Sequence, residues 1–257
     1  MIPPFLSVIV PAYNEDAGIA HTISAVAAEI DRLGVDAELI VVDDGSKDRT
    51  ASIVAKASRA DRRVRLVRAP HAGKGAAVRR GMLEARGAWR FFADADLSMP
   101  ISELSRFTGT GGEAPSGDVI IGSREAPGAV RLGEPWFRHA IGRLFNWAAR
   151  LLVLRGVNDT QCGFKLFSAR AAESLFTLQR IDGFGFDVEI LFLARRAGLV
   201  VREIPVTWEY GRDSKVSLAS GARGFLDLFT IRWNQVRGAY PPPVRGSERL
   251  GSSAGLQ

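Results

Sequence analysis

The first half of the chain alternates between two hydrophobic patterns. Short runs of apolar, often β-branched residues, each closed by a turn-forming or acidic residue, are typical of strands buried inside a sheet. Between these runs, apolar residues recur every three or four positions, which is the spacing of a helix packed on one side. We expect strands at residues 5–10, 38–42, 64–67, 89–93 and 118–123, and helices at 17–33, 50–60 and 73–85.

This alternation of strand and helix predicts the fold class. Strands separated by helices at this spacing form βαβ units, whose strands run parallel in one sheet. We therefore expect an α/β fold with a single, mostly parallel, Rossmann-like central sheet flanked by helices.

The second half of the chain predicts longer amphipathic helices. Residues 135–155 read as one such helix, and we expect further helices at 186–196 and 221–236 and a strand at 200–210. In the first of these helices the apolar and polar residues gather on opposite faces. The apolar face consists of Phe137, Ile141, Leu144, Ala148, Leu151 and Leu152, and the polar face of His139, Arg143, Asn146 and Arg150.

Two of these helices suit a membrane surface. Tryptophan, phenylalanine and arginine side chains at 135–155 and 221–236 are typical of helices that lie in the headgroup plane. A helix that packs on the sheet and turns a charged face to solvent fits the same pattern, and the sequence leaves both readings open. Residues 239–257 are rich in proline, glycine and serine, so we expect a disordered tail after one domain over residues 1–238.

Composition narrows the range of partners. The chain has 257 residues, 46% of them hydrophobic and 24% charged, which is typical of a globular protein. Its single cysteine, Cys162, excludes an internal disulfide and is expected to be a small buried side chain. No run of about 18 apolar residues predicts a membrane span. The net charge of +6 favours an anionic partner, such as a phosphorylated substrate or a membrane, and without a recognition motif we expect no nucleic acid.

Acidic residues follow three of the expected strands. Glu15 comes after the first, Asp43 and Asp44 after the second, and Asp94 and Asp96 after the fourth. Ligands of open parallel sheets bind beyond the carboxyl ends of the strands, so these side chains mark the expected site. Residues two apart in an extended segment point to the same side, which lets Asp94 and Asp96 approach one ion. Because carboxylate oxygens suit Mg²⁺ or Mn²⁺, these two residues are the expected metal ligands.

Residues 73–75, Gly-Lys-Gly, open the third expected helix. Free backbone amides at a helix N-terminus attract an anion, and Lys74 adds a positive charge. A tight glycine turn with a solvated lysine accounts for the triplet equally well. The P-loop and the GxGxxG fingerprint of dinucleotide-binding proteins are both absent. The three histidines, His21, His71 and His139, form no motif and are expected to be structural or exposed.

Four segments of the first half resemble the family 2 glycosyltransferases in sequence, order and spacing. They are residues 5–15 (FLSVIVPAYNE), 40–46 (IVVDDGS), 73–75 (GKG) and 94–96 (DAD). In the second half, residues 159–167 (DTQCGFKLF) and 186–190 (FDVEI) resemble the dolichyl-phosphate β-glucosyltransferases and their polyprenyl-phosphate relatives. The related dolichyl-phosphate mannose synthases match this half less closely. The resemblance implies a GT-A fold, with a nucleotide-binding half over about 5–125 and an acceptor-binding half over about 126–238.

The resemblance also implies roles for individual residues. The nucleotide sugar is expected to meet Pro11, Tyr13, Glu15, Asp43, Asp44, Lys74, Asp94 and Asp96. The acceptor phosphate is expected to meet Arg124, Arg138, Arg212 and Lys215. The catalytic residues are expected to be Asp96, Asp187, Arg124 and Arg212. For Asp187 the sequence leaves a second reading open, as the N-cap of the helix that begins near residue 186.

The residues and the resemblance together predict an inverting, metal-dependent hexosyltransferase. A phosphate monoester acceptor has a second pKa of about 6, so it is mostly ionised at neutral pH and needs no general base. Arginine forks match phosphate oxygens and suit a site where two anions must meet. The resemblance favours UDP-glucose as the donor and a polyprenyl or dolichyl phosphate as the acceptor. We expect a cytoplasmic protein at the inner face of a membrane, with a membrane protein as a further candidate partner.

Three alternatives stay open at this point. On the same scaffold, GDP-mannose or a UDP-aminosugar could be the donor. A non-catalytic membrane-binding module would use the basic helices without any chemistry. A nucleotidyltransferase has a similar sheet and similar metal carboxylates, but it should carry a glycine-rich loop directly after the first strand, where this chain has residues 11–15, PAYNE.

Overall fold

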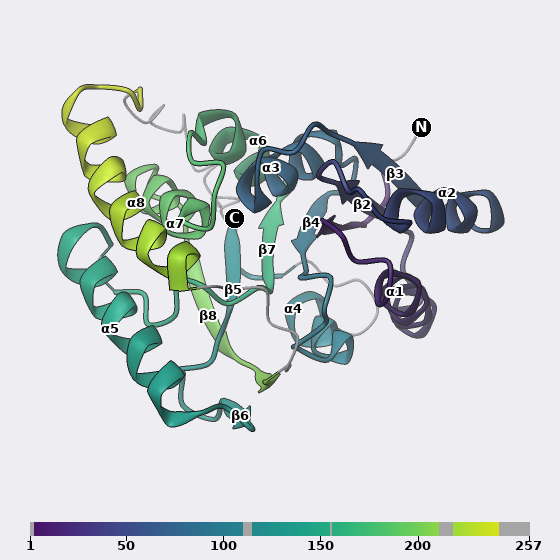
Figure 1. Cartoon of the computed structure of the whole chain (residues 1–257), viewed down its shortest axis with the longest axis horizontal. Helices are drawn as coiled ribbons and strands as arrows, with labels where there is room; N and C mark the ends of the chain where they lie inside the picture. The colour runs from purple at the N-terminus through teal and green to yellow at the C-terminus, as the bar shows by residue number, and fades with distance from the viewer. Residues whose placement is uncertain (1–2, 110–114, 155, 211–217, 242–257) are drawn as a thin grey trace, which may run out of the picture.

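The structure, a computed structural model, describes residues 3–109, 115–154, 156–210 and 218–241 (Figure 1). The central sheet is built from β1 (Leu6–Ala12), β2 (Ala37–Asp43), β3 (Val64–Arg68), β4 (Trp89–Phe92), β5 (Val119–Ser123), β7 (Lys165–Ser168) and β8 (Val201–Pro205). Their order in the sheet is β3-β2-β1-β4-β7-β5-β8. Only β7 runs antiparallel to its neighbours among these strands. The predicted α/β fold class with a single, mostly parallel sheet is confirmed.

Helices cover both faces of this sheet (Figure 1). One face carries α1 (Ile19–Leu33), α2 (Thr50–Ala60) and the short α4 (Leu104–Thr108), which follows the 3-10 turn η1 (Ile101–Glu103). The other carries α3 (Lys74–Glu84), α5 (Trp136–Leu152), α6 (Ala169–Leu178), α7 (Phe186–Arg196) and α8 (Leu218–Val236). Successive strand residues point to opposite faces, so Val8 joins one core and Ile9 the other.

The predicted elements of the first half match the structure to within two residues at most boundaries. One prediction in the second half was wrong. The strand expected at 200–210 is two strands, β8 and β9 (Thr207–Glu209), on either side of the buried Val206. β9 leaves the main sheet and pairs with β6 (Val130–Leu132) in a separate two-stranded sheet. Hydrophobic pattern alone does not show where a strand changes partners.

The sequence did not predict β7 and α6. β7 has only four residues. Two adjacent residues within it, Leu166 and Phe167, are both buried, so the alternation of buried and exposed residues typical of a half-exposed strand is absent. The strand is held by pairing with β4 on one side and β5 on the other. Ser168 then caps α6, its hydroxyl accepting a hydrogen bond from the backbone N of Ala171 at 3.2 Å.

The first residues of the expected tail are packed against the domain. Tyr240 is 1% exposed, and its hydroxyl donates to Oε1 of Glu189 at 2.6 Å. The guanidinium of Arg180 donates to the carbonyl of Ala239. Aromatic burial against α7 therefore extends the folded chain past residue 239, whereas residues 242–257 lie outside the described part of the chain.

Apolar side chains of α5 and α8 point away from the sheet. The two helices lie side by side at one end of the molecule (Figure 1), with the rings of Phe145 and Phe225 in edge contact at 5.1 Å. Phe145, Asn146 and Ala149 face the core, so α5 does pack against the domain, but its exposed face is mostly apolar and not the charged one expected of a packed helix. The exposed residues, here called the apolar surface, are Trp136, Phe137, Ile141, Leu144, Trp147 and Leu151 of α5 and Leu226, Phe229, Trp233 and Val236 of α8.

Exposed apolar surfaces of this kind mark contact sites for proteins or membranes. In the described part of the chain, no helix combines the length and the hydropathy that a membrane span requires.

Candidate active site

The site begins where β1 and β2 end together. Their register pairs Ala12 with Asp43, so the loops that follow start at the same edge of the sheet. The side chain of Asn14 accepts a hydrogen bond from the backbone N of Lys47 at 2.8 Å, and the backbone N of Asn14 donates to Ser46 at 2.9 Å. Asn14 has a φ of 52°, a value that is uncommon outside glycine. These bonds hold the loop that carries two of the expected nucleotide-binding residues, Tyr13 and Glu15, directly after Pro11 at the end of β1.

Asp44 ties the end of β2 to the loop before α3. Its carboxylate, almost wholly buried, accepts hydrogen bonds from Nδ1 of His71 at 2.8 Å and from the backbone N of Ala72 and Gly73. The His71 ring stacks on the Tyr13 ring, with centroids 4.1 Å apart and planes 19° apart. His71 is thus part of the site and was missed, because only its place two residues before the Gly-Lys-Gly triplet could have indicated it.

Lys74 stands at the N-terminus of α3 and pairs with Asp94 across 2.6 Å. Its ammonium group also lies over the rings of Phe92 and Phe184, at 5.3 and 5.7 Å. Burial alone would lower the pKa of Lys74, but the negative charges of Asp94 and Asp187 outweigh it, so the pKa is raised. The reading of Lys74 as a solvated lysine is therefore wrong.

The two carboxylates expected to bind a metal follow β4 directly. Asp94 is half-buried and Asp96 exposed, and Oδ1 of Asp96 accepts a hydrogen bond from the backbone N of Ser98. Between them and this serine, Leu97 has a φ of 46°, and such strain gathers at functional sites. Among the described residues, no third histidine, cysteine or carboxylate joins them in a metal-binding cluster. Two carboxylates fit Mg²⁺ or Mn²⁺, which typically keep positions for substrate phosphates.

Asp187 lies close enough to Lys74 for its charge to act on that ammonium, and it forms a buried ion pair with Lys165. Its Oδ1 accepts from the ammonium of Lys165 at 2.5 Å, and Lys165 also donates to the carbonyl of Cys162. Burial raises the pKa of Asp187, although Lys165 and Lys74 oppose the shift. The residue that precedes α7 is Gly185, so the reading of Asp187 as the helix cap is wrong. Lys165 was missed, since its strand was not predicted and its partner Asp187 lies 22 residues away in the sequence.

Cys162 behaves as expected for a buried apolar side chain. It is fully buried, and burial raises the pKa of its thiol to about 12. The next residue, Gly163, packs against Asp94: a Cβ at this position would lie 2.0 Å from Oδ2 of that carboxylate. The backbone after residue 161 therefore approaches Asp94 as closely as only glycine allows.

Arg124 follows β5 and is held by Asp159. Nε and Nη2 of the guanidinium bond to the two oxygens of this carboxylate at 2.8 and 3.0 Å. Burial would raise the pKa of Asp159, but the charge and hydrogen bonds of Arg124 outweigh it and hold the pKa at about 2. The structure does not place the side chains of the other expected acceptor residues. Arg212 and Lys215 lie outside the described residues, and for Arg138 only the backbone, in the first turn of α5, is described.

Replacing Asp159 with asparagine should lower the free energy of unfolding by about 2 kcal/mol near pH 7. A carboxyl whose pKa drops from about 3.8 to about 2 on folding stabilises the folded state above both values. This contribution is lost as the pH falls from about 4 to about 2, so the difference between wild type and Asp159→Asn should shrink over that range. Denaturant unfolding at neutral and acidic pH measures it, and a difference independent of pH would contradict the assignment.

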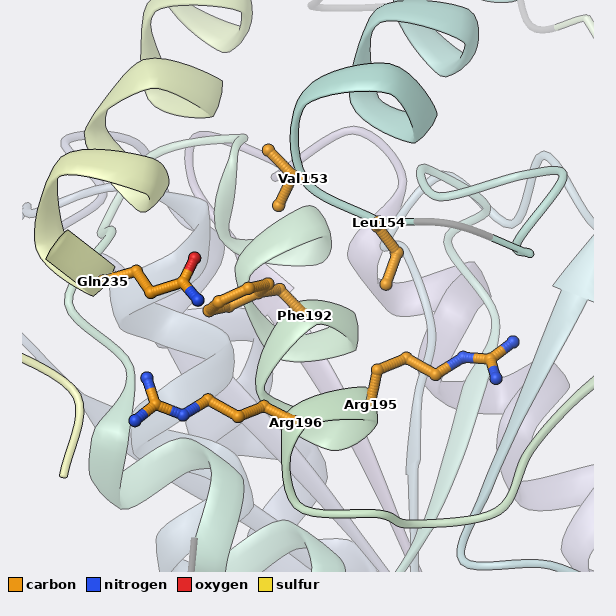
Figure 2. Close-up of a pocket in the computed structure, with 6 residues that line it drawn as sticks. All are labelled: Val153, Leu154, Phe192, Arg195, Arg196 and Gln235. Atoms are coloured by element: carbon orange, nitrogen blue, oxygen red, sulfur yellow. The ribbon is translucent and has the colours of Figure 1, made fainter. Parts of the chain in front are cut away.

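A cavity of about 350 Å³ lies elsewhere, between the end of α5, α7 and α8 (Figure 2). Figure 2 shows Arg195 and Arg196 pointing in opposite directions from α7. Both guanidinium groups donate to backbone carbonyls, those of Gly156 and Tyr240. This cavity is lined by none of the site residues and plays no part in the site.

The chain is similar to known proteins over most of its length. The family model described as Glycosyl transferase family 2 matches residues 7–176. A dolichyl-phosphate beta-glucosyltransferase of Saccharomyces cerevisiae is 32% identical over 255 residues, covering 92% of this chain and 76% of the relative. One from Homo sapiens is 31% identical over 251 residues, covering 91% and 77%.

Solved structures share the fold at lower identity. Mannosyl-3-phosphoglycerate synthase from Rubrobacter xylanophilus matches with a TM-score of 0.67 and 16% identity, covering 95% of this chain and 77% of that one. Glucosyl-3-phosphoglycerate synthase from Mycobacterium tuberculosis, in complex with Mn²⁺, UDP and glucosyl-3-phosphoglycerate, matches with a TM-score of 0.63 and 20% identity, covering 90% and 80%. The fold is the GT-A fold. With a family model over two thirds of its length and relatives above 30% identity over nine tenths of it, this chain belongs to glycosyltransferase family 2.

Proposed function

We propose that this chain transfers glucose from UDP-glucose to a polyprenyl or dolichyl phosphate, with inversion at the anomeric carbon. The names of the yeast and human relatives support the donor sugar and the acceptor. The observation that carries the proposal is the meeting of Lys74, Asp94 and Asp187 at one edge of the sheet. A cation and a metal-binding carboxylate suit a nucleotide diphosphate, and a buried carboxylate suits the hydroxyls of a sugar.

The donor half of the site is assigned as follows. Asp94 and Asp96 would hold Mg²⁺ or Mn²⁺, which when bound offsets the charge of the diphosphate leaving group. Lys74 adds a fixed cation at the N-terminus of α3, where backbone amides favour an anion. Asp187, anchored by Lys165, accepts hydrogen bonds from the sugar hydroxyls. The stacked rings of Tyr13 and His71 line the nucleoside end of the site.

The acceptor half needs no general base, because the phosphate arrives ionised. Nε and Nη2 of Arg124 are bonded to Asp159. Nη1 has no hydrogen-bond partner among the described residues, and we assign it to the acceptor phosphate. Arg138, Arg212 and Lys215 remain predicted partners of the same phosphate. Displacement by the phosphate oxygen on the face opposite the diphosphate inverts the anomeric carbon, so an α-linked donor gives a β-linked product.

We further propose that the apolar surface of α5 and α8 rests on the membrane that carries the acceptor. Aromatic and aliphatic side chains flanked by arginines suit the boundary between headgroups and acyl chains. On this proposal the protein is a cytoplasmic, peripheral one at the inner face of the membrane, and a membrane-protein partner is a further candidate for the same surface.

Donor selection is the first experiment. Purified protein is incubated with Mn²⁺ or Mg²⁺, a short polyprenyl phosphate in detergent, and labelled UDP-glucose, UDP-aminosugars or GDP-mannose. A lipid-linked product from UDP-glucose alone supports the proposal. A product from GDP-mannose or a UDP-aminosugar would show that this nucleotide sugar, and not UDP-glucose, is the donor. No product from any donor, together with no metal-dependent binding of UDP, would favour the non-catalytic membrane-binding module instead.

Replacing Gly163 with alanine should lower kcat/KM for this transfer about 10²-fold without unfolding the protein. The added Cβ would lie 2.0 Å from Oδ2 of Asp94 and displace the carboxylate, and small displacements at a reacting centre carry costs of this size. Gly142→Ala is the matched control, since a Cβ on that residue of α5 meets nothing within 4 Å. Equal activity of the two variants would mean that Asp94 has no required position.

A further inference from the structure

A second cavity, of about 220 Å³, lies on the polar flank of α5. Its lining is Glu125, Arg143, Asn146, Arg150 and Asn158. Three of these residues come from α5 at intervals of three and four, so they share one side of the helix. None of the five is among the residues assigned to the donor or to the acceptor phosphate.

The two arginines of this cavity, Arg143 and Arg150, form no ion pair with the described residues. Arg143 has no hydrogen-bond or ion-pair partner among the described residues, and Arg150 makes only a long contact of 3.5 Å with Oδ1 of Asn158. By contrast, the one carboxylate of the cavity, Glu125, is already bonded to Arg131. Two arginines that face a cavity without a counter-charge of their own favour an anion there.

The amide groups of the cavity are held in place by the protein. Oδ1 of Asn146, a buried residue, accepts from both the backbone N and the hydroxyl of Thr160, at 3.2 and 3.0 Å. Its Nδ2 group, which can donate two hydrogen bonds, has no acceptor in the described part of the chain. Asn158 is fixed by two bonds to Glu203, at 2.8 and 2.7 Å. The Nδ2 group of Asn146 is thus the oriented amide donor that an anion in the cavity would meet, whereas the donors of Asn158 are already bonded to Glu203.

The cavity also borders the apolar surface. Trp147 lies four residues after Arg143 and three before Arg150, so it neighbours both on the helix. This tryptophan is 56% exposed and belongs to the apolar surface. A group bound in the cavity would thus sit at the level where headgroups meet acyl chains if the apolar surface rests on a membrane.

We propose that this cavity binds a phosphate group carried by a membrane lipid, as a second anion site beside the transfer site. Arginine forks and amide N–H groups are the donors that phosphate oxygens accept. The inference rests on the proposed function in one respect, that this face meets a membrane. It assigns Arg143 and Arg150 to holding the protein at the surface and not to glycosyl transfer.

Vesicle binding of the full chain tests the proposal. Partition onto phosphatidylcholine vesicles containing phosphatidic acid is compared for wild type, Arg143→Gln/Arg150→Gln and the control Arg59→Gln/Arg62→Gln. The control removes the same charge from exposed arginines at and just beyond the end of α2, on the far side of the molecule (Figure 1). We expect the cavity variant to bind about tenfold more weakly than wild type and the control to stay within about twofold. Equal losses in the two variants would overturn the proposal, since they would reflect net charge alone.

Two further arms separate the sources of the phosphate. In vesicles whose negative charge comes from a fatty-acid carboxylate, the cavity variant and the control should differ little. Titration with inorganic phosphate by calorimetry should give a signal in wild type that the cavity variant lacks. The cavity variant could lose the calorimetric phosphate signal and still bind vesicles as well as the control variant does. That result would assign the cavity to a soluble phosphate ester and overturn the lipid source.

A readout of transfer keeps this inference distinct from the proposed function. In detergent with a short polyprenyl phosphate, the cavity variant should transfer glucose within about twofold of wild type, because no membrane has to be bound. If wild type transfers nothing from any donor, the proposed function fails while the vesicle comparison still stands. Unfolding midpoints of the two single variants, Arg143→Gln and Arg150→Gln, check that weaker binding does not come from a damaged fold.

Discussion

Replacing Asp96 with asparagine should lower kcat/KM for glucosyl transfer about 10³-fold. The substitution removes one of two carboxylate charges expected to hold the metal, at the point where the diphosphate leaves. It should cost little stability, because the exposed side chain can still accept the hydrogen bond from the backbone N of Ser98. Steady-state kinetics at saturating Mn²⁺, with denaturant unfolding beside it, measures both effects.

The matched control for this prediction is Asp36→Asn, which removes the same charge from an exposed position just before β2. Its kcat/KM should stay within about twofold of wild type, as surface substitutions away from a site change little. Metal titration adds a second readout, since Asp96→Asn should need more Mn²⁺ for half-maximal UDP binding. Unchanged transfer in Asp96→Asn would remove this carboxylate from the metal site.

Replacing Lys165 with methionine should lower the free energy of unfolding by about 3–5 kcal/mol. Lys165 is 1% exposed, and its ammonium is the direct partner of the buried Asp187 carboxylate at 2.5 Å. Removing one member of a buried pair leaves the other charge uncompensated, which costs this much, whereas replacing both by apolar residues is often close to neutral. We therefore expect Lys165→Met/Asp187→Leu to be more stable than Lys165→Met alone.

Chemical denaturation of the two variants, with Lys56→Met on the exposed side of α2 as control, measures the effect. The double variant should recover stability and still lack transfer activity, because Asp187 is the proposed acceptor of sugar hydroxyl hydrogen bonds. A double variant less stable than the single one would show that the pair stabilises the fold through contacts other than charge. Full activity in the double variant would remove Asp187 from the site.

The strand and helix prediction succeeded where hydrophobic periodicity was strong. β1, β2 and β4 are short apolar runs, and α1 repeats its buried residues every three or four positions. β7 failed the same test because it is buried on both faces and only four residues long. Its position between β4 and β5 depends on pairing with strands far apart in the chain, which no local pattern contains.

In the candidate site, too, the residues placed by local sequence pattern were predicted, and those placed by contacts between distant segments were not. Asp94, Asp96 and Lys74 were expected together because parallel strands and the helices that follow them place their ends at one edge. The partner of Asp187 and the partner of Arg124 could not be expected, since Lys165 and Asp159 lie 22 and 35 residues away in sequence. His71 came into the site only because the carboxylate of Asp44 turns its ring onto Tyr13.

The amino-acid sequence by itself determined the α/β class, the edge of the sheet at which the expected site residues gather, and the acidic residues proposed to bind a metal. These depend on local periodicity and on the rule that parallel strands end together, and both are written in short segments of the chain. Only the tertiary structure decided which face of α5 meets the core, which charges are buried as pairs, and which arginines have no ion-pair partner in the described part of the chain. Those outcomes depend on contacts between distant segments, where burial makes an unpaired charge costly and a paired one stable.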